Sequence, residues 1–189
     1  MQSILIITTI MYGLLFDMSY EDIDYSYLNN QIDISVENFK NEYDEYQEYY
    51  NTHYFNNEHI DDIAKKIEKY FNSTLNGKGY FVAEYSISVG LDPYLAAAVM
   101  LQETGCYWTC SGLTRKCNNV GGNKGRPSCN GGSYRKFSTL NDGIKFAINK
   151  LNSYYKKGKK TPKQINPYYA ESKTWHVNVE KYMKKLKKG

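Results

Sequence analysis

Long apolar runs are missing from this chain of 189 residues. The longest covers residues 3–16 and falls short of the roughly 20 apolar residues that a membrane-spanning helix needs. Its length suits the apolar core of a secretory signal peptide, although no Lys or Arg precedes it. We interpret residues 1–16 as a signal peptide or a short membrane anchor for an exported chain, with a buried strand as the alternative.

Glycine and proline are absent from residues 17–57, and aliphatic side chains are few there. The stretch from Asp17 to Tyr50 contains ten acidic residues and one lysine, a net charge of −9. So much charge with so little aliphatic content favours a solvated segment over a packed domain. We predict an acidic, tyrosine-rich stalk or linker over residues 17–56. Part of it is expected to be helical, because apolar side chains recur every three or four residues: Val36, Phe39, Tyr43, Tyr46 and Tyr50.

The opposite charge dominates residues 104–189, which hold nineteen Lys or Arg and three Asp or Glu, a net charge of +16. A basic region of this kind favours an anionic partner such as a nucleic acid, a membrane surface or a cell-wall polymer. The lysine clusters at 156–160 and 184–188 come without a known nucleic-acid-binding motif. We therefore expect anionic wall polymers, and no nucleic acid, as partners of a chain that is secreted or anchored on the extracytoplasmic side of the membrane.

Helical periodicity predicts one domain over residues 57–189. Six helices are expected, over about 60–71, 80–89, 93–104 and 140–155 and in shorter pieces after residues 161 and 174. Four of them follow a polar residue that suits a helix start: Asp92, Thr139, Thr161 and Thr174. Gly105 is the expected stop of the third helix.

The cysteines are confined to residues 104–137, a stretch rich in Gly, Asn and Ser: Cys106, Cys110, Cys117 and Cys129. An even number of cysteines in one loop of an exported chain predicts two disulfides, which can be paired in three ways. A zinc site is the alternative, but the C-x2-C pairs typical of structural zinc are missing. We expect an irregular lobe with short strands, stapled by disulfides and free of metal.

Acidic residues are absent between Glu103 and Asp142. Glu103 lies at the C-terminal end of an apolar helix, where the helix dipole and the apolar neighbours both disfavour a charged carboxylate. We therefore expect a raised pKa for Glu103, as a general acid requires, with an ordinary surface glutamate as the alternative. A second carboxylate for glycosidase chemistry would have to come from a distant residue such as Asp142 or Glu171, or be replaced by the substrate's acetamido group or 6-hydroxyl.

Four short motifs, in the same order, resemble those of glucosaminidase-type peptidoglycan hydrolases of the lysozyme-like superfamily. Residues 100–105 (Met-Leu-Gln-Glu-Thr-Gly) resemble the end of their catalytic helix, and residues 117–125 resemble their "NN-x-x-G-x-K-G" signature. Residues 134–138 resemble the aromatic-x-x-aromatic-Ser step that follows. Tyr169 and Ala170, a few residues before Trp175, resemble the C-terminal "Tyr-Ala" motif. The resemblance spans roughly residues 75–187.

The resemblance implies an α+β, mostly helical, lysozyme-like fold with two lobes, one of them the disulfide-stapled lobe. It implies cleavage of the β-1,4 bond between N-acetylglucosamine and N-acetylmuramic acid, with Glu103 as general acid and Tyr169 as a residue that positions the transition state or the acetamido group. We expect a monomer that uses no cofactor. The residues expected to bind the substrate or shape its cleft are Asn118, Asn119, Gly122, Lys124, Tyr134, Phe137 and Trp175.

Two other functions stay open. Because the lobe after Glu103 lacks a carboxylate, the chain is also compatible with a lytic transglycosylase of the same fold, which works with a single glutamate. The same lack is compatible with a non-catalytic module that binds the cell wall. The chemical ends of the glycan fragments released from purified wall would distinguish the hydrolase, the transglycosylase and the wall-binding module.

Overall fold

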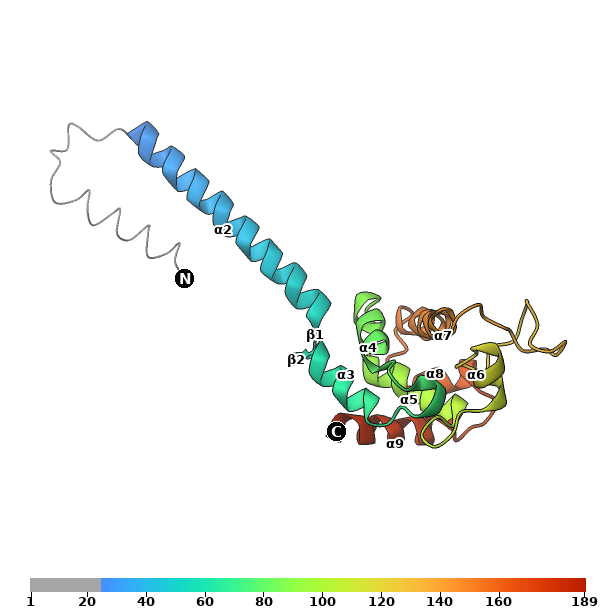
Figure 1. Cartoon of the computed structure of the whole chain (residues 1–189). Coiled ribbons are helices and arrows are strands. Elements are labelled where there is room, and N and C mark those ends of the chain that lie inside the picture. The colour runs from blue at the N-terminus through green and yellow to red at the C-terminus, as the bar shows by residue number, and fades with distance from the viewer. Residues whose placement is uncertain (1–24) are drawn as a thin grey trace. The chain divides into compact units, whose positions relative to one another are not determined.

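The computed structural model describes residues 25–189, so the signal peptide or anchor predicted over residues 1–16 lies outside the described residues. Eight α-helices and one two-stranded sheet make up the regular structure of the described part, which confirms the mostly helical class (Figure 1). None of these helices is long and apolar enough to cross a membrane. The chain divides into two compact units, one ending at Tyr50 and one from Asn51 to Gly189.

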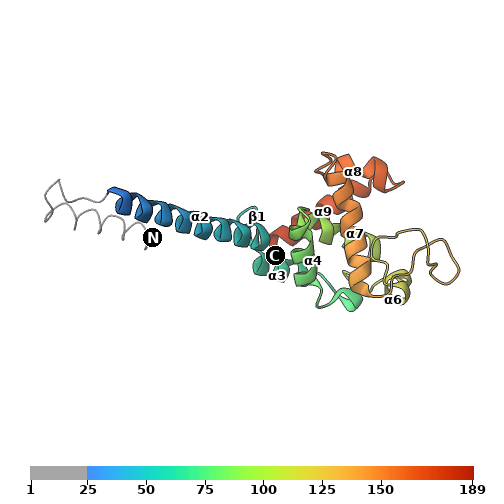
Figure 2. The ribbon, with the colours of Figure 1, turned by 90° about the horizontal axis from the view of Figure 1, so that it is seen from above.

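The described part of the first unit is a single long helix. α2 (Tyr25–His53) runs without interruption for 29 residues (Figure 2). This confirms the helical periodicity expected within residues 17–57. Its large apolar side chains are exposed: Ile32, Ile34, Val36, Phe39, Tyr43, Tyr46 and Tyr49.

A short hairpin follows α2, near the start of the second unit. β1 (Tyr54–Phe55) and β2 (Glu58–His59) pair antiparallel, with Tyr54 opposite His59. The turn residues Asn56 and Asn57 have positive φ angles of 50° and 65°, a conformation that asparagine adopts more readily than most residues. The hairpin has only two residues in each strand, so helices provide the core.

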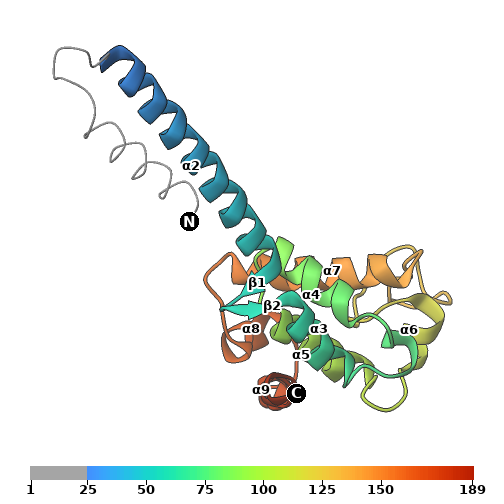
Figure 3. The same ribbon diagram turned by 60° about the vertical axis from the view of Figure 1, so that its left-hand side comes forward.

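Three helices build the centre of that core (Figure 3). α3 (Ile60–Glu68) and α4 (Gly79–Ser88) pack together, with a short 3-10 turn, η1 (Ser73–Leu75), between them in the chain. α5 (Pro93–Thr104) packs against α4 and is apolar on nearly all sides. A helix of that composition is stable only when it is surrounded, and almost every side chain of α5 is buried.

Both ends of α5 are where the sequence predicts them. The carboxylate of Asp92 accepts hydrogen bonds from the N–H groups of Tyr94 at 2.8 Å and Leu95 at 3.3 Å. These bonds satisfy two of the N–H groups that a helix start leaves without a partner. Gly105 ends the helix in the left-handed conformation, with φ at 67°. The helix therefore stops just after Glu103 and Thr104.

An irregular lobe follows α5. Its helix, α6 (Gly112–Cys117), was not predicted, because six residues are too few to display helical periodicity. Two isolated bridges, one between Lys124 and Tyr134 and one between Ser128 and Arg135, stand where short strands were expected. Within residues 25–189 the β-structure is therefore smaller than an α+β class suggests.

The two predicted disulfides are present, and they join Cys106 to Cys110 and Cys117 to Cys129. All four cysteines are bonded, so no thiolate is left for the alternative zinc site. The first disulfide closes the turn after α5, and the second ties the end of α6 to the loop that follows. Disulfides persist in oxidising surroundings such as the outside of the cell.

Three further helices complete the unit: α7 (Leu140–Tyr155), α8 (Pro162–Tyr169) and α9 (Trp175–Lys188). Thr139 and Thr161 form capping boxes at the starts of α7 and α8, as expected. The prediction that Thr174 caps α9 is wrong for its side chain, which makes no capping hydrogen bond and lies 3.2 Å from the hydroxyl of Ser172. α9 packs against α5 and α8, which brings the end of the chain back to the core.

Candidate active site

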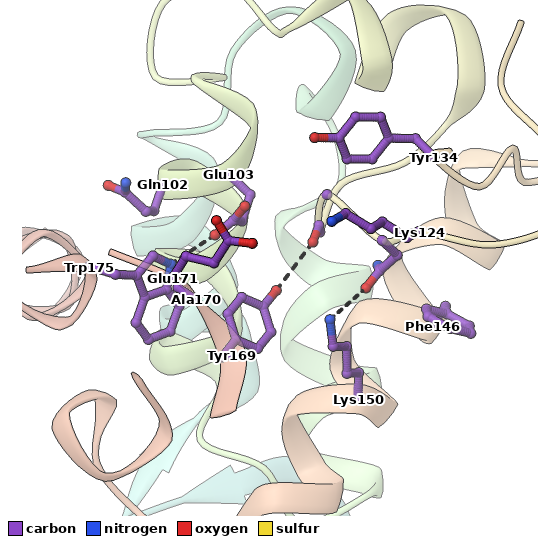
Figure 4. Close-up of a pocket in the computed structure, with 13 residues that line it drawn as sticks. Gln102, Glu103, Lys124, Tyr134, Phe146, Lys150, Tyr169, Ala170, Glu171 and Trp175 are labelled. Atoms are coloured by element: carbon purple, nitrogen blue, oxygen red, sulfur yellow. Dashed lines mark hydrogen bonds between the residues drawn. The ribbon is translucent and has the colours of Figure 1, made fainter. Parts of the chain in front are cut away.

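A cleft of about 750 Å³ opens beside the C-terminal end of α5 (Figure 4). α5, the loop after α6, helix α7 and the segment that joins α8 to α9 supply its walls. In Figure 4, Glu103 and Trp175 lie on one side of the cleft, and Lys124 and Lys150 lie on the other. The lining residues are Gln102, Glu103, Gly121, Gly122, Asn123, Lys124, Tyr134, Phe146, Lys150, Tyr169, Ala170, Glu171 and Trp175.

Glu103 is half-buried at the helix end, and its carboxylate accepts a hydrogen bond from the indole N–H of Trp175 at 2.8 Å. Burial raises the pKa of Glu103 above its ordinary value, while the Trp175 hydrogen bond and the positive charge of Lys150 partly oppose that rise. The net shift is upward, as expected from the sequence. The carboxyl therefore holds its proton to a higher pH than an exposed glutamate does.

Two aromatic residues, Tyr169 and Trp175, pack together beside the Glu103 carboxyl. The rings of Tyr169 and Trp175 lie 4.9 Å apart between centroids, and the indole of Trp175 is 4% exposed. The hydroxyl of Tyr169 donates to the carbonyl oxygen of Gly121 at 3.4 Å. Burial, and then the nearby charge of Glu103, raise the pKa of Tyr169, so its hydroxyl stays protonated and able to donate.

Lys150 of α7 was not predicted as a site residue. Its ammonium donates to the side-chain oxygen of Asn123 at 3.1 Å and lies 4.6 Å from the centre of the Tyr169 ring. Burial lowers the pKa of Lys150, and the charge of Glu103 partly opposes this. The sequence held one signal, since Phe146 and Lys150 are four residues apart and so lie on the same side of the predicted helix.

Glycine is required where the loop approaches the acid. Gly122 has a positive φ of 59°, and a Cβ placed on it would lie 3.1 Å from the Oε2 atom of Glu103. A Cβ on Gly121 would lie 2.7 Å from the Nδ2 atom of Asn123. Because neither glycine has a Cβ, the backbone at both positions can lie close to these polar side chains.

The two asparagines of the signature motif support the cleft from behind. The buried amide of Asn119 donates to the carbonyl oxygens of Asn123 at 2.8 Å and Arg135 at 2.7 Å, and it accepts from the Asn123 N–H at 2.9 Å. Asn118 has a left-handed backbone and donates to the carbonyl oxygen of Phe137 at 3.1 Å. These bonds fix the loop that carries Gly121 and Gly122, which agrees with a role in shaping the cleft floor.

The structure brings six of the predicted site residues to the surface of the cleft and leaves three away from it. Those that line it are Glu103, Gly122, Lys124, Tyr134, Tyr169 and Trp175. Those that do not are Asn118, Asn119 and Phe137. Phe137 is buried and packs 5.2 Å from Phe146, which takes the place at the cleft surface instead.

Of the two distant acids that the sequence offered as a second carboxylate, Asp142 and Glu171, only Glu171 lines the cleft. Asp142 accepts hydrogen bonds from the backbone N–H of Thr139 at 3.1 Å and from its hydroxyl at 2.8 Å, so it serves the start of α7. Glu171 is exposed and lines the cleft together with Glu103. A second carboxylate therefore reaches the site from the segment after α8.

No protein-family model matches the sequence, and no curated protein matches it significantly. Residues 25–189 contain no group of three His, Cys, Asp or Glu side chains placed to bind a metal ion. The side chains that line the cleft offer carboxyl, phenol and ammonium groups as proton donors and acceptors.

Proposed function

We propose that this chain is a glycosidase that cleaves the β-1,4 bond between N-acetylglucosamine and N-acetylmuramic acid in peptidoglycan. One observation carries the proposal: Glu103 lies half-buried in a cleft, and burial raises its pKa. A carboxyl that keeps its proton can donate it to the glycosidic oxygen as the bond breaks. We propose with it a lysozyme-like fold, in which the helical core and the irregular lobe are the two lobes around the cleft.

The other lining residues suit a glycan. Tyr134 and Phe146 offer ring faces against which the apolar face of a sugar can pack. Lys124 and Gln102 offer polar groups for hydroxyl and acetamido groups. Trp175 is too deeply buried to stack on a sugar, so we assign it to holding the Glu103 carboxyl in place.

Glu171 is our candidate for the second catalytic carboxylate. It lines the same cleft and is open to solvent, as a base that activates a water molecule has to be. In this scheme Glu103 protonates the leaving oxygen, and Glu171 takes a proton from the water that attacks the sugar.

Lytic transglycosylation is the second candidate, favoured by the absence of Asp and Glu from residues 104–141. The loop side of the cleft then contributes no carboxylate. In that reaction Glu103 first protonates the glycosidic oxygen and then accepts the proton of the muramyl 6-hydroxyl, which closes a 1,6-anhydro ring.

We also propose that the protein acts outside the cytoplasm, secreted or held by an N-terminal anchor. The two disulfides support an oxidising location. The net charge of +16 over residues 104–189 complements anionic wall polymers, which would concentrate the enzyme on its substrate.

The test is mass spectrometry of the fragments that the whole chain releases from purified cell wall, with Glu103→Gln as the matched variant. Glutamine keeps an acceptor for the Trp175 N–H but cannot act as an acid. We expect fragments with reducing-end N-acetylglucosamine from the native chain and a loss of rate of at least about a hundredfold in the variant, at an unchanged melting temperature.

Each other outcome has a meaning. A 1,6-anhydro-muramic end identifies the lytic reaction. Bound wall without fragments identifies a wall-binding module. Unchanged turnover in Glu103→Gln ends the assignment of Glu103, and with it the proposed mechanism.

A further inference from the structure

The exposed face of α2 carries a regular row of large apolar side chains. Each of the five is at least 53% exposed: Ile32, Val36, Phe39, Tyr43 and Tyr46. Their spacing alternates between four and three residues, so all five lie on one face of the helix. None of the functions proposed above uses this row.

A 4-3 alternation is the spacing of the a and d positions of a coiled coil. Val36 and Tyr43 then occupy a positions, and Ile32, Phe39 and Tyr46 occupy d positions. The preceding a position is held by Asn29, which is exposed. An asparagine at an a position favours in-register pairing with the same asparagine of a second helix.

A helix in water usually owes its stability to the burial of an apolar face. α2 has six acidic residues and one lysine, and its apolar row faces solvent. A partner that covers the row from Ile32 to Tyr46 would supply the missing burial over about 20 Å of helix. The composition of α2 therefore favours a paired helix over a single one.

The charges of α2 are placed so that a second copy fits. Four of its six acids fall at b, c or f positions, away from the row: Glu37, Asp44, Glu45 and Glu48. In a parallel pair, Ser35 lies across from Lys40, and Glu42 lies across from Gln47. Neither of these flanking pairs brings like charges together.

We infer that α2 pairs with α2 of a second copy of this chain as a parallel, in-register coiled coil through the row from Ile32 to Tyr46. The protein is then a dimer, in place of the monomer expected from the sequence. The inference is independent of the proposed enzymatic activity, since the row from Ile32 to Tyr46 belongs to the first unit and the cleft to the second.

The experiment is sedimentation equilibrium of the purified full chain, of Val36→Ser and of Ile34→Ser. Val36 and Ile34 are both β-branched and exposed, but Ile34 lies at an f position on the other side of the helix. We expect twice the monomer mass for the native chain, and a dissociation constant raised at least tenfold by Val36→Ser and unchanged by Ile34→Ser. A monomer at every concentration, or equal dissociation constants for the two variants, would overturn the inference.

Cross-linking tests the orientation. Oxidation of Asn29→Cys should give a covalent dimer, because the two a positions face each other in a parallel, in-register pair. Ile34→Cys, at an f position, should not cross-link. Equal cross-linking of both variants, or of Ile34→Cys alone, would contradict the parallel arrangement.

Discussion

Different interactions stabilise the two sides of the cleft, which are helix α5 and the loop of residues 118–137. Glu103 belongs to α5, whose residues are buried among α4, α7 and α9, so its position depends on many small apolar contacts. The facing loop, residues 118–137, has few buried apolar side chains. Hydrogen bonds of Asn119 and one disulfide hold it instead. The helical side should therefore control stability, and the loop should control activity.

The largest effect on stability is expected from the helical side. Leu95 is fully buried in α5, and Leu95→Ala removes its side-chain contacts and leaves a cavity. We expect the free energy of unfolding to fall by about 2–5 kcal/mol, measured by denaturant titration, with normal activity in the molecules that remain folded. A loss below 1 kcal/mol would contradict the central place of α5.

The next effect tests the loop. Removing the Cys117–Cys129 disulfide, by reduction or by Ser at both positions, frees a loop whose ends are 12 residues apart and should cost up to about 3 kcal/mol. We expect activity to fall at temperatures where circular dichroism still reports folded helices. Removing the Cys106–Cys110 pair, which spans four residues, is the control and should cost less. Equal thermal stability with and without reductant would count against a structural role.

A smaller effect is expected where the loop meets the acid. Gly122→Ala should destabilise the protein by about 1–2 kcal/mol, because a Cβ is strained at this positive φ. It should also lower kcat, because the Cβ crowds the Glu103 carboxylate. Gly131→Ala is the matched control: its φ is 77°, and a Cβ there would meet nothing within 4 Å. Both should lower the melting temperature, and only Gly122→Ala should slow glycan cleavage; equal kcat values would contradict the contact.

The smallest effect concerns pH. Lys150 holds the pKa of Glu103 lower than burial alone would set it, so Lys150→Met should raise that pKa further. A general acid works while protonated and loses activity as the pH rises through its pKa, so the alkaline limb of kcat/KM should move to higher pH. Lys145→Met, on the same helix but over Phe81 and Tyr85, is the control. A shift of the limb to lower pH, or the same shift in both variants, would contradict this electrostatic coupling.

Prediction from sequence succeeded where a pattern is local. The helix that carries Glu103 was predicted with both of its ends, because Asp92 and Gly105 affect only the few residues next to them. The starts of α7 and α8 were predicted for the same reason. α9 begins directly after Thr174 as predicted, but the Thr174 side chain lies against the hydroxyl of Ser172 and makes no capping hydrogen bond. The prediction missed α6, because six residues are too few to display helical periodicity.

Four features could be predicted because they depend on neighbours along the chain: the helical class, the ends of α5, the number of disulfides and an acid at a helix end. Three others are visible only in the folded chain: which cysteines pair, that Glu171 and not Asp142 reaches the cleft, and that Lys150 lies beside Tyr169. The folded chain also shows that Asn119 supports the loop from inside. The cleft residues Glu103, Lys150 and Glu171 are far apart in the chain, and only the packing of α5, α7 and α9 brings them together.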